Sequence, residues 1–126
     1  DVLHFLTEFS ILANLYPCDM FEPDVLSKDV DTLDVLFDSI SGWGEKLSEL
    51  FMDFIHSLGM AAHELKNKPW KQSYKDTNLD EFYYYLRRAW FDYIRLAYQA
   101  GFTPQTLLEG YMDKNSINKN RQESGY

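Results

Sequence analysis

The sequence predicts an all-α protein, a bundle of about five helices. Apolar residues recur three and four positions apart along most of the chain, which is helical spacing. No stretch keeps the alternation of apolar and polar residues that is typical of a half-buried strand. Glycine, proline and capping residues separate the periodic stretches at positions where helices begin and end. With 126 residues, the chain is long enough for a single domain with one core.

The first helix is expected in the stretch DVLHFLTEFSILANLY, and Pro17 is expected to end it. The periodic pattern begins directly after Asp1, which could act as the N-cap. Because no polar residues lead into the pattern, the chain is expected to begin inside a helix. The apolar positions of this helix are Val2, Phe5, Leu6, Phe9, Leu12 and Leu15.

Two further helices are expected before the middle of the chain. Residues 17–28 are interpreted as a loop and residues 29–40 as a short helix, with one apolar face formed by Leu33, Leu36, Phe37 and Ile40. Gly42 and Gly44 indicate a break. A longer helix should then run from about Glu45 to Leu65, with an apolar stripe of Leu47, Leu50, Phe51, Phe54, Leu58 and Ala61 or Ala62.

The strongest helical pattern runs from about Leu79 to Ala100, capped by Asn78 or Thr77 and followed by Gly101. Its apolar stripe is Leu79, Phe82, Leu86, Trp90, Tyr93, Ala97 and Ala100. On the same helix Asp92 lies within helical reach of both Arg88 and Arg95, so these three residues are expected to pair with one another.

The last helix is expected to begin after Thr103 as its cap and Pro104 in its first turn. Its apolar side is formed by Leu107, Leu108 and Tyr111.

Composition and charge exclude several classes of protein. Hydrophobic residues make up 45% and aromatic residues 17% of the chain, which argues against general disorder. No apolar run approaches about 18 residues, so neither a membrane-spanning helix nor a signal peptide is expected. The net charge of −8 argues against a general nucleic-acid or membrane binder. The lone Cys18 is typical of a reducing compartment, and therefore of a cytoplasmic protein.

The charge is divided unevenly along the chain. Residues 1–65 carry 13 acidic and 2 basic side chains, a net charge of −11. Residues 66–126 carry 7 acidic and 10 basic side chains, a net charge of +3. The first part could hold cations and the second could hold anions, although a chance segregation of solvated faces would give the same pattern.

The polar end of the chain, YMDKNSINKNRQESGY, could form a phosphate-binding face. If the last helix continues through it, Lys114, Asn118 and Arg121 lie on one side together with Tyr111, and Asn115 lies beside them. Ammonium and guanidinium groups suit phosphate oxygens, and amides can complete the shell. On spacing alone, a solvated helix end is the alternative.

The same residues carry a resemblance to a known family. Their pattern, K-N-x-x-N-x-x-R-Q-x-x-G-Y, is formed by Lys114, Asn115, Asn118, Arg121, Gln122, Gly125 and Tyr126. It resembles the closing motif of the dimeric, all-α dUTP pyrophosphatases, and phage dCTP pyrophosphatases end similarly. At the other end, DVLHF resembles the part of that family in which E-x-x-D is followed by His-Phe. Asp1 matches the Asp of that motif, and His4 and Phe5 match the His-Phe.

The resemblance implies a Mg²⁺-dependent homodimer that cleaves a nucleoside triphosphate, most plausibly dUTP, between its α- and β-phosphates. It implies that Asp1 is a Mg²⁺ ligand and that His4 and Phe5 lie near the base or sugar. The phosphate-binding residues it implies are Tyr111, Lys114, Asn115, Asn118 and Arg121. Because the family's remaining acids would precede Asp1, residues 1–126 are expected to be the C-terminal part of a longer enzyme of bacterial or phage origin. No catalytic residue is assigned.

Other interpretations stay open. The chain could be a pyrophosphatase for dCTP or another dNTP, bind nucleotides without catalysis, or be a helical protein-binding domain. The basic connector around Trp70, from Lys66 to Lys71, could lie over the phosphates or form a solvated loop. An alternative metal pattern on the helix expected over residues 45–65 consists of Glu45, Glu49, Asp53, His56 and His63.

Overall fold

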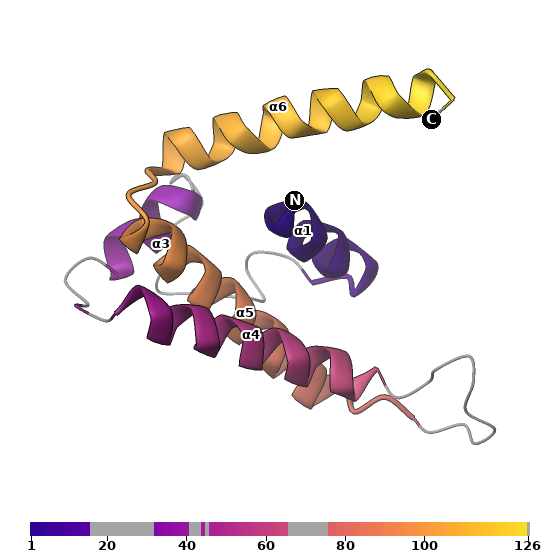
Figure 1. The fold of residues 1–126 in the computed structure, drawn as a ribbon. Helices are drawn as coiled ribbons and strands as arrows, with labels where there is room; N and C mark the ends of the chain where they lie inside the picture. Colours follow the sequence, from indigo (N-terminus) through magenta and orange to yellow (C-terminus); the bar gives the residue numbers. More distant parts are fainter. Residues whose placement is uncertain (16–31, 41–43, 45, 66–75, 126) are drawn as a thin grey trace.

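The computed structural model describes residues 1–15, 32–40, 44, 46–65 and 76–125 (Figure 1). These residues contain no strand and form five helices: α1 (Val2–Leu12), α3 (Thr32–Ile40), α4 (Leu47–Glu64), α5 (Leu79–Gln99) and α6 (Pro104–Glu123). The expected all-α class and the number of helices are confirmed. Some expectations concern residues outside the described ranges: Pro17, the loop 17–28, Cys18, Gly42, Glu45, the connector 66–71 and Tyr126.

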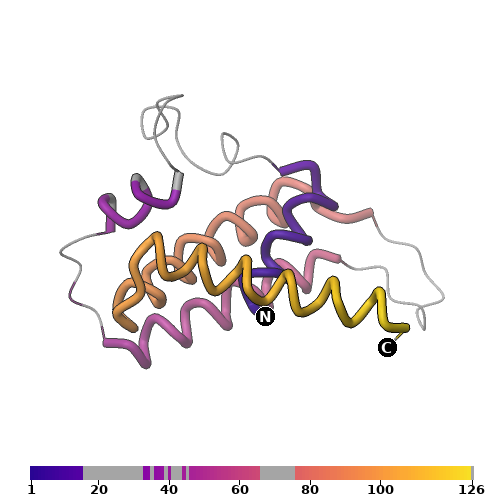
Figure 2. Tube along the Cα trace, turned by 90° about the horizontal axis from the view of Figure 1, so that it is seen from above, coloured from indigo at the N-terminus to yellow at the C-terminus, as the bar shows by residue number. Residues whose placement is uncertain are grey.

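The centre of the fold is the antiparallel pair α4 and α5, which forms the most extensive contact between described helices (Figure 1). α1 lies between this pair and α6, and α3 packs against α5 and α6. Viewed from above in Figure 2, α6 runs lengthwise over the other helices, and the N-terminus lies beside its middle. None of the described helices combines the length and the apolar character needed to cross a membrane.

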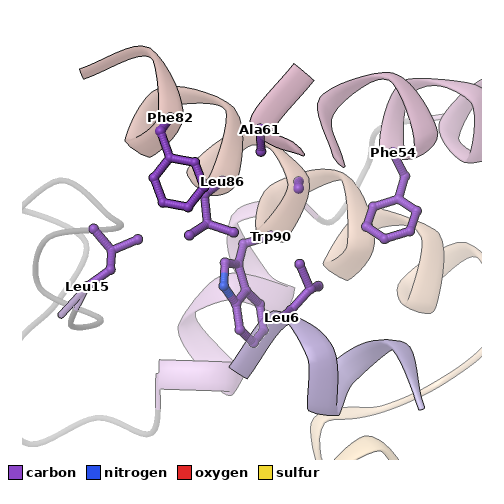
Figure 3. Packing of buried hydrophobic residues seen from close by; sticks show 8 residues of the cluster. Leu6, Leu15, Phe54, Ala61, Phe82, Leu86 and Trp90 are labelled. Carbon is purple, nitrogen blue, oxygen red and sulfur yellow. The ribbon is translucent and has the colours of Figure 1, made fainter. Parts of the chain in front are cut away.

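Two clusters of buried side chains follow α5. Near its beginning the cluster combines α1, α4 and α5, and Leu6 points toward the Trp90 indole (Figure 3). Its buried members are Leu6, Leu15, Phe54, Ala61, Phe82, Leu86, Ala89 and Trp90. Near the end of α5 the second cluster joins α3 and α6 through Leu36, Phe37, Ile40, Ile94, Ala97 and Leu107. The apolar face expected for the short helix, residues 33 to 40, is therefore confirmed.

The C-terminal half of α1 is attached to α5 by hydrogen bonds. The indole nitrogen of Trp90 donates to Ser10 Oγ over 2.8 Å, and Ser10 Oγ donates to the carbonyl of Leu6 over 2.8 Å. The Tyr83 hydroxyl donates to the carbonyl of Ala13 over 3.2 Å. Because a buried indole N–H needs a partner, Ser10 allows Trp90 to enter the core.

The expected boundaries of α5 and α6 are confirmed in detail. Asn78 caps α5 by accepting a hydrogen bond from the Glu81 amide over 3.3 Å, and Gly101, with φ +86°, closes its end. Thr103 and Thr106 form a capping box at the start of α6. The helix continues unbroken to Glu123, and Gly125, with φ +73°, follows it. The polar end of the chain is therefore helical.

The prediction that Pro17 ends the first helix is wrong, because α1 ends at Leu12. Asn14 adopts a left-handed conformation with φ 51°, and its amide donates to the Ile11 carbonyl over 3.1 Å. The amide of Leu15 donates to the Ser10 carbonyl over 2.8 Å. These two bonds form a Schellman motif, in which Asn takes the place more often filled by glycine.

The apolar stripes expected for α1 and α4 are only partly buried. On α4 the side facing the core consists of Leu50, Phe54, Ser57, Ala61 and Glu64, whereas Leu47 and Phe51 are half exposed. Of the apolar positions expected for the first helix, only Leu6 and Leu15 are buried, and Leu15 lies beyond the end of α1. The sequences of α1 and α4 each carry two adjacent rows of apolar residues. Only one row of each helix faces α5.

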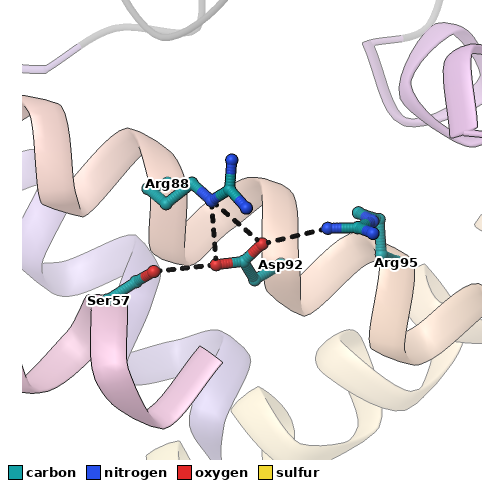
Figure 4. A network of polar contacts seen from close by, with 4 residues as sticks. All are labelled: Ser57, Arg88, Asp92 and Arg95. Atoms are coloured by element: carbon teal, nitrogen blue, oxygen red, sulfur yellow. Dashed lines mark hydrogen bonds and ion pairs between the residues drawn. The ribbon is translucent and has the colours of Figure 1, made fainter. Parts of the chain in front are cut away.

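A buried polar network joins α4 to α5 (Figure 4). Asp92, fully buried, accepts hydrogen bonds from Ser57 Oγ over 2.7 Å, Arg88 Nε over 3.3 Å and Arg95 Nη1 over 3.4 Å. The expected pairing of Asp92 with both arginines is thereby confirmed. Burial raises the pKa of the Asp92 carboxyl above its ordinary value, while Ser57 and Arg88 oppose that rise. Burial also lowers the pKa of the Arg95 guanidinium. The loss of hydration thus disfavours the charged forms of both Asp92 and Arg95.

Candidate functional site

The first turn of α1 meets the middle of α6 at a cavity of about 300 Å³. The cavity floor is apolar and comes from α5 and α6 residues such as Ala97 and Leu107. Its polar and aromatic groups are Asp1, His4, Tyr93, Phe102, Thr106, Tyr111 and Lys114. A small, largely apolar cavity with a few converging polar groups is typical of a ligand site.

Two side-chain contacts span this junction, and they involve residues from the two ends of the chain. Lys114 Nζ lies 3.1 Å from Asp1 Oδ1. The rings of His4 and Tyr111 stack with centroids 4.2 Å apart and planes inclined by 20°. Each helix contributes two residues three positions apart, so both lie on one face of their helix. The structure therefore brings together four of the residues that the sequence analysis selected.

The Asp1 carboxylate is directed to α6 and does not cap its own helix. Asp1 occupies the N-cap position of α1, but its side chain makes no capping hydrogen bond. The side chain of Asp1 is 67% exposed and that of Lys114 is 32% exposed, so water screens the pair. Asp1 therefore occupies the expected N-cap position, but its carboxylate pairs with Lys114 and does not cap the helix.

His4 supplies a buried polar atom at the cavity. Its Nε2 has no hydrogen-bond partner among the residues that the structure describes, although its ring stacks on Tyr111. A buried ring nitrogen without a partner costs free energy, and a ligand with a suitable donor or acceptor would remove that cost.

The remaining residues of the expected phosphate-binding face continue along α6 beyond the cavity. Asn118 is half-buried, whereas Asn115 and Arg121 are exposed. None of these three lines the cavity. Since α6 is continuous, Tyr111, Lys114, Asn118 and Arg121 share one side of the helix, as the spacing predicts. The structure thus aligns the expected phosphate-binding residues along α6. It does not bring Asn118 and Arg121 to the cavity beside α1.

Phe5 lies on a different side of α1 from His4. It is 66% exposed and lines a second cavity of about 300 Å³, together with Val2, Leu6, Phe9, Leu58, Ala61, Ala62, Phe82 and Leu86. Successive residues of a helix point about 100° apart, which explains why the His-Phe pair is divided between two cavities. The structure does not bring Phe5 together with Tyr111 and Lys114.

The sequence analysis missed Thr106 and Gly110, which line the cavity beside Tyr111. Both lie on the Lys114 side of α6, Thr106 eight and Gly110 four positions before Lys114. Extending the face by helical spacing toward the N-terminus of α6 would have found them. Tyr93 was assigned only to the core stripe of α5, yet it also lines the cavity.

Comparison with known proteins gives one match. A family model described as dUTPase matches residues 1–126. The chain belongs to the dUTPase family. The all-helical fold fits the all-α dUTPases that the two terminal motifs resemble. No curated protein and no solved structure matches the chain.

A Mg²⁺ site in this dUTPase-family chain would have to be shared with its substrate. Asp1 is the only carboxylate among the described residues that line the cavity. No group of three or more metal-ligating side chains is found in the described part of the chain, α4 included. Mg²⁺ is commonly bound through one or two carboxylates plus phosphate oxygens and water. Asp1 therefore fits as one ligand of such an ion and does not form a protein cage for it.

Proposed function

We propose that this member of the dUTPase family hydrolyses dUTP to dUMP and pyrophosphate in the presence of Mg²⁺. Membership of the family supports a hydrolase of the pyrophosphatase kind. The observation that carries the proposal is the junction of α1 and α6, where Asp1 contacts Lys114 and His4 stacks on Tyr111. These contacts support the proposal that Asp1, as a cation ligand, and Lys114, as an anion ligand, act at one cavity.

In this proposal α6 binds the triphosphate along one side. Lys114 and Arg121 supply positive charge, Asn115 and Asn118 supply amides, and Tyr111 supplies a hydroxyl beside them. The positions of Lys114, Asn118 and Arg121 extend over two turns of the helix, so they can contact successive phosphates. Fixed cations of this kind stabilise the charge that develops as the linkage between the α- and β-phosphates is cleaved.

His4 is proposed to face the nucleoside part of the substrate. Its buried Nε2 lies at the cavity, and none of the described residues is its hydrogen-bond partner, so a polar group of the base or sugar would satisfy it. Phe5 would contribute a stacking face only from the other side of α1, where it lines the second cavity. We therefore assign base or sugar contact to His4 first and to Phe5 second.

Asp1 is proposed to be one Mg²⁺ ligand, with phosphate oxygens of the substrate and water as the other ligands. Bound Mg²⁺ neutralises phosphate charge and lowers the pKa of coordinated water. The contribution of Asp1 is an exposed carboxylate oxygen near the phosphate-binding lysine. The cytoplasmic location expected from Cys18 and the bacterial or phage origin remain predictions.

Pyrophosphate release tests the proposal. The purified protein is incubated with Mg²⁺ and with each of dUTP, dCTP, dTTP, dATP and dGTP in turn. We expect release of pyrophosphate and dUMP from dUTP, with no release when EDTA replaces Mg²⁺. Release from dCTP alone would change the assigned substrate and keep the reaction. An absence of release from all five nucleotides would contradict the proposed activity.

A second candidate is a nucleotide-binding module without catalysis. It is favoured by the single carboxylate among the described residues at the cavity, because the family resemblance implies that hydrolysis needs more acids than Asp1. The module would bind dUTP in a calorimeter and leave it intact. Binding together with release of dUMP would exclude it.

The proposed homodimer would cover the apolar face between α1 and α4. Val2, Phe5 and Phe9 of α1 surround the second cavity together with Leu58 and Ala62 of α4. Three of these side chains, Val2, Phe5 and Phe9, are large, hydrophobic and exposed. Contiguous exposed apolar residues of this kind mark an interface in soluble proteins, and a second copy is the occupant that the family resemblance implies.

Sedimentation equilibrium tests the dimer with a matched pair of variants. Phe5 and Ile11 are 66% and 61% exposed on α1, and only Phe5 lines the apolar cavity. We expect a dimer for the wild type and for Ile11→Glu, and a monomer for Phe5→Glu. A monomeric wild type, or the same mass for both variants, would contradict the proposed interface.

A further inference from the structure

Two side chains that the proposed function assigns to opposite ligands are bound to each other. Asp1 would hold a divalent cation and Lys114 would hold a phosphate, yet Asp1 Oδ1 and Lys114 Nζ lie 3.1 Å apart. A polyphosphate approaching Lys114 would meet the negative charge of Asp1 at close range. The carboxylate would therefore weaken anion binding for as long as it remains uncompensated.

We propose that the Asp1–Lys114 ion pair is a latch that couples the two ligands. In the absence of a cation, Asp1 competes with polyphosphate for Lys114. When a divalent cation occupies Asp1, the carboxylate no longer opposes the anion, and Lys114 becomes available to it. Cation and polyphosphate therefore bind with positive cooperativity, and by linkage each increases the affinity of the other. This inference rests on the proposed function, because it assumes that both ligands bind at this junction.

The packing of α6 indicates what the latch holds in place. Leu107, near the beginning of α6, is the only buried residue of that helix. Farther along, the described contacts between α6 and α1 include the Asp1–Lys114 pair and the neighbouring His4–Tyr111 stack. Figure 1 shows α6 continuing past α1 to the C-terminus. If the Asp1–Lys114 pair opened, the His4–Tyr111 stack would still hold α6 against α1. Ligand exchange would therefore not require the core to move.

The exposure of the pair makes it weak enough to open. With 67% of the Asp1 side chain and 32% of the Lys114 side chain exposed, the interaction belongs to the class of solvent-screened ion pairs. Such pairs change an equilibrium by about 2- to 5-fold. A ligand can overcome an effect of this size, and a binding measurement can resolve it.

Isothermal titration of inorganic pyrophosphate, with and without Mg²⁺, tests the latch. Without metal, we expect Asp1→Asn to bind pyrophosphate about 2- to 5-fold more tightly than the wild type, because Lys114 loses its competitor. With pyrophosphate as its magnesium complex at fixed free Mg²⁺, the same variant should bind more weakly than the wild type. This reversal separates the latch from a simple loss of negative charge, which would tighten binding under both conditions.

Two control variants make the test specific. Asp113→Asn removes one carboxylate from α6, at the position next to Lys114 in sequence. Among the described ion pairs, Lys114 pairs with Asp1 and not with Asp113. Asp113→Asn should therefore change the affinity for pyrophosphate less than Asp1→Asn does. In the Lys114→Gln background, Asp1→Asn should no longer tighten metal-free binding. Folding of each variant is checked by its circular dichroism and thermal transition.

The outcomes separate the latch from the proposed activity. Equal metal-free affinity of the wild type and Asp1→Asn, in a protein that hydrolyses dUTP, would overturn the latch and leave the activity intact. Equal tightening by Asp113→Asn would also overturn it. No binding of pyrophosphate in either condition, together with no hydrolysis, would overturn both the latch and the proposed function.

Discussion

Two of the ion pairs in the described part of the chain lie in very different surroundings. Asp92 and Arg95 lie at the α4–α5 interface with 0% and 4% of their side chains exposed. Asp1 and Lys114 lie between α1 and α6 with 67% and 32% exposed. The buried pair cannot exchange its partners for solvent or a ligand without opening the core, whereas the exposed pair can. Burial, and not residue type, therefore separates a structural ion pair from one available for binding.

Removing the buried acid should give the largest effect on stability. Asp92→Ala removes the buried carboxylate that accepts hydrogen bonds from Arg95 and Ser57. We expect the free energy of unfolding, measured by urea denaturation, to fall by about 3–5 kcal/mol. If the variant is largely unfolded without denaturant, the loss is read from its far-UV circular dichroism.

Asp113→Ala on the exposed side of α6 is the control for this change. It should alter the free energy of unfolding by no more than about 0.5 kcal/mol. Similar losses for Asp92→Ala and Asp113→Ala would contradict the distinction between the two regions.

Removing one hydrogen bond from the same network should have an intermediate effect. Ser57→Ala deletes the 2.7 Å hydrogen bond to Asp92 and keeps both arginines. The expected loss in the free energy of unfolding is about 1–3 kcal/mol, because the acceptor is a buried charged group. Unchanged stability would mean that another donor replaces Ser57 at Asp92.

Removing the exposed pair should have the smallest effect on stability. Lys114→Gln, which breaks the contact with Asp1, should change the free energy of unfolding by no more than about 1 kcal/mol. The change should shrink further in 0.5 M salt, because salt screens exposed charges. A loss as large as that of Asp92→Ala would show that this pair is structural as well.

Local features of the fold were predictable from the sequence, because they depend on residues close in the chain. The cap at Asn78, the turn at Gly101 and the cap at Thr103 are set by neighbouring backbone groups. The pairing of Asp92 with Arg88 and Arg95 follows from helical spacing in the same way. The end of α1 was missed, since an Asn in the left-handed conformation gives a weaker signal than a proline.

Contacts between distant elements were predictable only in part. Which apolar row of α4 faces α5 depends on the arrangement of the helices, and spacing alone does not fix it. Ser57 of α4 contacts Asp92 across that interface, so no local pattern indicates it. Asp1 and Lys114 stand at opposite ends of the chain, and only the family resemblance placed them in one site. The same resemblance did not indicate that Phe5 faces a different cavity from His4.

The hydrolysis of dUTP by Lys114→Gln, compared with Lys119→Gln, tests the central claim most directly. Both lysines lie on α6 and both pair with a carboxylate, but Lys114 faces the α1 junction, whereas Lys119 pairs with Glu123 on its own helix at 4.0 Å. If the junction binds the triphosphate, kcat/KM should fall at least about 10-fold in Lys114→Gln, the loss of about one charge-assisted contact. It should stay within about 2-fold of the wild type in Lys119→Gln. Equal effects of the two substitutions on kcat/KM would contradict the assignment of the site.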